Sequence, residues 1–122
     1  MTQEALGLIA DSLDDIGINY EFAEWSSEVP TTYFIGEYQE EESITEDGMQ
    51  NTTFILTGTT RGRWLELEQA KAEIEKEFEN KTAIINHQGI AVWYSSSLPV
   101  PTDVEELKRI QINLKIKEWK VN

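Results

Sequence analysis

The chain has 122 residues, of which 39% are hydrophobic, and a formal net charge of −13. This length suits one folded domain over residues 1–122 with a modest core, and the absence of cysteine excludes disulfides and thiolate metal sites. A chain this acidic repels phosphate, so we do not expect it to read duplex DNA directly, which requires Lys and Arg to displace counterions.

The first predicted element is an amphipathic helix. Its apolar residues recur in steps of three and four, which places four of them on one face: Leu6, Ile9, Leu13 and Ile16. In this pattern Ser12 and its acidic neighbours point elsewhere. Gly17 is placed to end the helix, because glycine accepts the left-handed conformation without penalty. Residues 18–22 then alternate apolar and polar side chains, which predicts a half-buried strand.

A long β-hairpin is predicted over residues 32–59. Aromatic and β-branched residues fill both halves, and Asp47-Gly48 is a favoured turn pair because both residues tolerate positive φ. Five acids gather toward its tip with no Lys or Arg beside them, and we call them the acidic cluster: Glu40, Glu41, Glu42, Glu46 and Asp47. The sequence thus predicts a projecting arm that carries this cluster.

A second amphipathic helix is predicted over residues 63–79, with its apolar face marked by Trp64, Leu67, Ala70, Ile74 and Phe78. A second hairpin follows around residues 87–89, with Gly89 expected to supply the positive φ. Residues 99–101, which contain two prolines, predict an extended connection.

The end of the chain shows a clear strand pattern. Apolar and polar residues alternate strictly over residues 110–117. The predicted order is therefore α-β-β-β-α-β-β-β. It indicates an α+β fold with two helices packed on one face of a mostly antiparallel sheet.

Catalytic and metal-binding patterns are weak throughout. His87, the single histidine, falls at a predicted turn without a nucleophile pattern beside it. Residues 58–63 have glycines before a helix but lack the Gly-Lys-Ser/Thr ending of a phosphate loop, and the acidic cluster lacks the ligand spacing of an EF-hand. We therefore expect no catalytic residue, no metal site and no cofactor, and a protein that is not an enzyme.

Charge is distributed unevenly along the chain. Residues 1–60 hold 13 acids and no Lys or Arg, whereas residues 61–122 hold 10 acids and 10 bases. Arg61 and Arg63 stand at the start of the neutral half, and arginine favours carboxylate pairs at interfaces. These two residues are candidates for a subunit interface with the acidic cluster of a neighbouring copy.

The element order resembles that of the tail terminator and tail-completion proteins of long-tailed bacteriophages, including lambda-type terminators and prophage tail components. The most specific segment is residues 30–62. It contains a Tyr-Phe-x-Gly-Glu-Tyr strand over 33–38, a Glu-Asp-Gly turn over 46–48 and a Phe-x-Leu-Thr-Gly strand over 54–58.

The resemblance implies a structural virion protein that caps the tail tube as a ring and forms the surface joining tail to head. It implies self-association into a ring of six on assembly, or a monomer when free, and contact with the tail tube protein and the head connector protein. DNA would pass through an acidic lumen without specific binding. The expected location is the virion tail, assembled in the cytoplasm of a bacterial host, with no membrane contact.

Two other functions fit the same composition. A small acidic protein that mimics DNA and inhibits a DNA-binding protein would have a similar net charge, although five acids crowded on one hairpin do not match an even spacing of phosphates. A head completion or connector protein of the same particle is also consistent, because it too is a small assembly module without chemistry.

Overall fold

The computed structural model describes residues 1–41 and 48–122. It is an α+β structure, as predicted, with two helices and six strands. In chain order its elements are α1 (Gln3–Asp15), β1 (Tyr20–Phe22), β2 (Thr32–Glu40), β3 (Gln50–Thr60), α2 (Trp64–Glu77), β4 (Lys81–Ile85), β5 (Gln88–Val100) and β6 (Lys108–Lys120).

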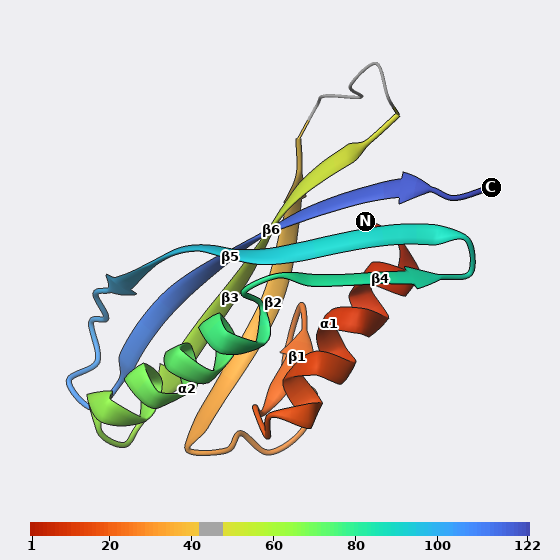
Figure 1. Ribbon diagram of the computed structural model, residues 1–122. Coiled ribbons are helices and arrows are strands. Elements are labelled where there is room, and N and C mark those ends of the chain that lie inside the picture. The colour runs from red at the N-terminus through yellow and green to blue at the C-terminus, as the bar shows by residue number, and fades with distance from the viewer. Residues whose placement is uncertain (42–47) are drawn as a thin grey trace.

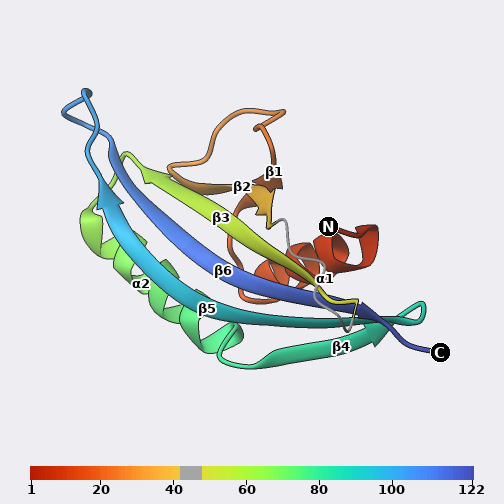
Figure 2. The ribbon, with the colours of Figure 1, turned by 90° about the horizontal axis from the view of Figure 1, so that it is seen from above.

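All six strands form one sheet in the order β1-β2-β3-β6-β5-β4. Every neighbouring pair is antiparallel except β1 with β2, which run parallel. The long strands β3, β6 and β5 curve together through the middle of the molecule (Figure 2). The last strand of the chain, β6, therefore lies in the middle of the sheet, between β3 and β5.

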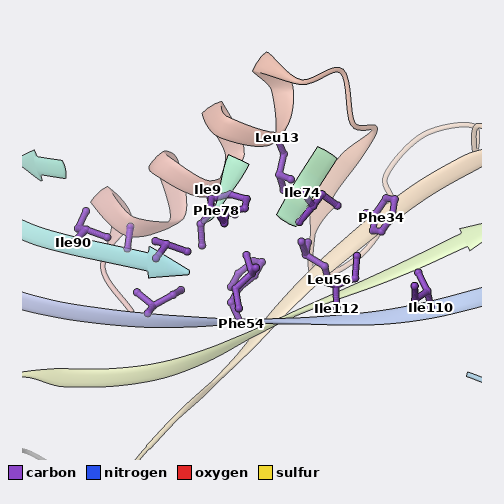
Figure 3. Packing of buried hydrophobic residues seen from close by; sticks show 14 of the residues in the cluster. Ile9, Leu13, Phe34, Phe54, Leu56, Ile74, Phe78, Ile90, Ile110 and Ile112 are labelled. Atoms are coloured by element: carbon purple, nitrogen blue, oxygen red, sulfur yellow. The ribbon is translucent and has the colours of Figure 1, made fainter. Parts of the chain in front are cut away.

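Both helices pack on the same face of this sheet (Figure 1). The core contains Ile9 and Leu13 of α1 and Ile74 of α2, which point toward the sheet in Figure 3. Alternate residues of the central strands meet them, because successive side chains of a strand point to opposite faces. On β6 these are Ile110, Ile112, Leu114 and Ile116, all at most 2% exposed. The alternation in the sequence predicted this face correctly.

Two glycines in the central hairpin make room for aromatic rings. Phe34 pairs with Gly58 across the β2–β3 ladder, and a Cβ on Gly58 would lie 2.3 Å from the Phe34 ring. A Cβ on Gly36 would in turn lie 2.5 Å from the Phe54 ring. Of the two motifs, Tyr-Phe-x-Gly-Glu-Tyr in β2 and Phe-x-Leu-Thr-Gly in β3, each supplies a phenylalanine that covers the glycine of the other. This reciprocal packing explains the residues of both motifs without reference to function.

The β2–β3 hairpin is antiparallel as predicted, but it is not a separate arm in the described strands. β3 pairs with β2 on one side and with β6 on the other, from Gln50 opposite Glu118 to Thr60 opposite Lys108. The prediction of a projecting arm did not foresee that β6 pairs with β3 over its whole length, and the predicted tip over residues 42–47 lies outside the described residues. Gly48 has φ +75°, as expected for a turn residue.

Helix α1 differs from its prediction in which face it buries. Its buried residues include Ser12, which was expected to point away from the core, whereas Leu6 is only partly buried. Ser12 can be buried because its Oγ donates to the Leu8 carbonyl at 2.7 Å, which satisfies the hydroxyl within the helix. Gly17 ends the helix with φ +75°, as predicted.

The second hairpin uses other turn residues than expected. Asn86 and His87 take positive φ values of 51° and 64°, whereas Gly89 lies under the Trp119 ring, 2.2 Å from where its Cβ would be. The glycine is needed for a close approach, not for a turn. β5 also continues through Pro99, which was assigned to a connection. Pro99 is tolerated there because β4 pairs with β5 only as far as Val92, so the outer edge beyond it has no strand partner.

Candidate interaction surfaces

The described part of the acidic cluster lies beside cations of the same chain. Glu40 contacts the Met1 amine, and Glu41 accepts from Lys115 Nζ at 3.2 Å and from Thr53 Oγ1 at 3.2 Å. The Lys115 hydrogen bond is the main reason that the pKa of Glu41 lies below its ordinary value. Both side chains remain about half exposed, at 45% and 47%. They are thus accessible to a partner, although their charge is partly balanced.

The remaining members of the cluster, Glu42, Glu46 and Asp47, lie outside the described residues. Arg61 and Arg63 are both exposed on the connection between β3 and α2. Among the described residues, no ion pair joins Glu40 or Glu41 to Arg61 or Arg63.

A polar network beside these arginines was not predicted. The carboxylate of Glu66 accepts from Thr32 Oγ1 at 2.9 Å and from Thr60 Oγ1 at 3.1 Å, and these hydrogen bonds lower its pKa. The network ties the first turn of α2 to the ends of β2 and β3. A Glu three residues after the N-cap Arg63 was the available sequence signal, since acids in that position commonly stabilise a helix start.

Glu118 is a second charged residue that sequence reasoning missed. It is 2% exposed, and its Oε1 accepts from the hydroxyl of Thr2, the N-cap of α1. Its position continues the buried alternation of Ile112, Leu114 and Ile116 by one more step, which was the signal that could have revealed it. Its role is structural, because it attaches the start of α1 to the sheet.

In residues 1–41 and 48–122, no helix covers the face of the sheet opposite α1 and α2, and we call it the open face. β6 presents its polar alternate residues there: Arg109, Gln111, Asn113, Lys115 and Lys117. In register beside them, β5 and β4 present apolar side chains that include Trp93, Leu98 and Ile84, which are 36%, 45% and 66% exposed. The open face thus combines polar side chains, three of them basic, with large apolar residues.

The edge of the sheet formed by β1 carries a cleft beside exposed aromatic rings. A cleft of about 420 Å³ opens between α1 and β1, which we call the edge cleft, lined by Leu6, Gly7, Ala10, Tyr20, Glu21 and Phe22. The Phe22 ring stacks on that of Tyr38, with centroids 5.9 Å apart, and each residue is 41% exposed. Burial raises the pKa of Tyr20 to about 12, so this phenol stays neutral.

The edge cleft has one charged residue in its lining, Glu21. Residues 1–40 contain no Lys or Arg. Helix α1 alone carries four acids and no base. On the open face the described strands present three bases, Arg109, Lys115 and Lys117, and two acids, Glu21 and Glu37, while Glu41, directly after β2, pairs there with Lys115. Acids and bases therefore share the open face.

Over residues 1–41 and 48–122, no group of three or more His, Cys, Asp or Glu side chains is arranged to hold a metal ion. Neither helix of this described part is long and apolar enough to cross a membrane. His87 occupies the turn between β4 and β5, where the sequence placed it.

Comparison with known proteins bears on the fold alone. No protein-family model matches the chain, and no curated protein matches it. A solved structure of a protein known only by a sequence identifier superposes with a TM-score of 0.74 at 15% identity, over 100% of this chain and 99% of that one. At this identity the similarity shows a shared fold over the whole chain.

Proposed function

We propose that the protein is a structural component of a bacteriophage or prophage tail, which assembles as a ring at the end of the tail tube and forms the surface that joins tail to head. The observation that carries this proposal is the separation of charge along the chain: residues 1–60 hold 13 acids and no Lys or Arg, while all 10 bases lie in residues 61–122, and three of those bases project from β6 on the open face. The resemblance over residues 30–62 supports the same proposal.

Separated charges favour association between different surfaces of identical copies. When one surface of a subunit binds a different surface of the next, the contact is heterologous, and a rotation that closes gives a ring. Arg61 and Arg63 are exposed on the connection between β3 and α2, where they are available for carboxylates of a neighbouring copy. The acidic cluster, represented in the described chain by Glu40 and Glu41, would then face the lumen or a neighbouring subunit.

An acidic lumen suits the passage of DNA. Phosphates are repelled by carboxylates, and without a lining of bases no counterions are released on contact, so the duplex moves through without binding. In this proposal the protein contacts the tail tube protein on one side of the ring and the head connector protein on the other.

The test is the native mass of the purified protein at low and high concentration, with and without Mg²⁺ to screen the acids, combined with negative-stain microscopy. The proposal predicts closed rings with a central hole that do not retain duplex DNA in an electrophoretic assay. A protein that stays monomeric under every condition and binds a DNA-binding protein in competition with DNA would contradict it. That result would instead favour a DNA mimic, the function consistent with the same net charge of −13.

A further inference from the structure

We draw no further inference here: the strongest candidate, the edge cleft between α1 and β1 with the exposed rings of Phe22 and Tyr38 beside it, is an apolar surface, and nothing in the described residues shows what covers it.

Discussion

On the side of the sheet covered by α1 and α2, β3 and β6 present Phe54, Leu56 and a row of isoleucines that are almost completely buried. On the other side the same strands present Thr53, Ile55 and the bases of β6, and no helix covers them. Adjacent residues of one strand therefore lie on different faces, one in the core and the next on the open face. The covered face holds the fold together, whereas the open face is free to recognise a partner, and this separation allows one to be changed without the other.

The largest expected effect comes from emptying the covered face. Phe54 is 0% exposed and packs on Gly36 and on the ring of Tyr20, so Phe54→Ala should lower the free energy of unfolding by about 3–5 kcal/mol. The matched control is Ile55→Ala, the next residue on the open face, which should cost much less. Urea denaturation of both variants measures the difference. Equal losses would show that the open face is also part of the core.

A smaller effect should follow from filling a glycine position. Gly58→Val places a side chain where the Phe34 ring lies, 2.3 Å from the new Cβ, and should lower the free energy of unfolding by about 1–3 kcal/mol because the ring must shift. Thr57→Val, one residue away on the open face, is the control. Thermal denaturation measures both variants. Equal midpoints for Gly58→Val and Thr57→Val would contradict the packing of Phe34 on Gly58.

The Glu66 network predicts a dependence of stability on pH. Its pKa lies below the ordinary 4.5, so its contribution to stability is fully present above pH 4.5 and is lost as the pH falls through the lower pKa of the folded state. Glu66→Gln should therefore be less stable than wild type at neutral pH, and the difference should shrink in acid. The exposed Glu73→Gln is the control on the same helix. A difference between Glu66→Gln and wild type that grows on acidification would be the opposite of this expectation.

The smallest effect on folding is expected from the open face itself. Lys117→Ala should change the free energy of unfolding by less than about 0.5 kcal/mol, because Lys117 projects from the face that no helix covers. Its neighbour Ile116 points into the core, so Ile116→Ala should cost about 2–5 kcal/mol. Denaturation of the two variants compares the faces at adjacent positions. A large loss for Lys117→Ala would mean that the open face supports the fold.

Local patterns in the sequence were sufficient for the elements and for much of the core. Steps of three and four placed Leu67 and Ile74 of α2 correctly, and strict alternation placed the isoleucines of β6. Patterns failed where a tertiary contact replaced a local rule. Ser12 is buried because its hydroxyl bonds within its own helix, and Gly89 leaves room for the Trp119 ring instead of forming the turn.

The candidate surfaces were less predictable than the elements. The acidic cluster and the two arginines are short runs of charge that the sequence shows directly. The edge cleft, by contrast, joins residues of α1, β1 and β2 that are distant in sequence. The open face likewise depends on the register of β5 with β6, which aligns Trp93 with Lys115. Register and strand order arise from pairing between distant segments, and no local periodicity specifies them.

The sequence by itself determined the α+β class, the amphipathic helices, the hairpins and the concentration of acid in the first half, because each follows from the order of residues along the chain. Only the tertiary structure decided that β6 lies between β3 and β5 and that both helices cover one face. The physical reason is that burial selects among the possible pairings of these elements, and the surfaces left over after that selection are the ones available for binding.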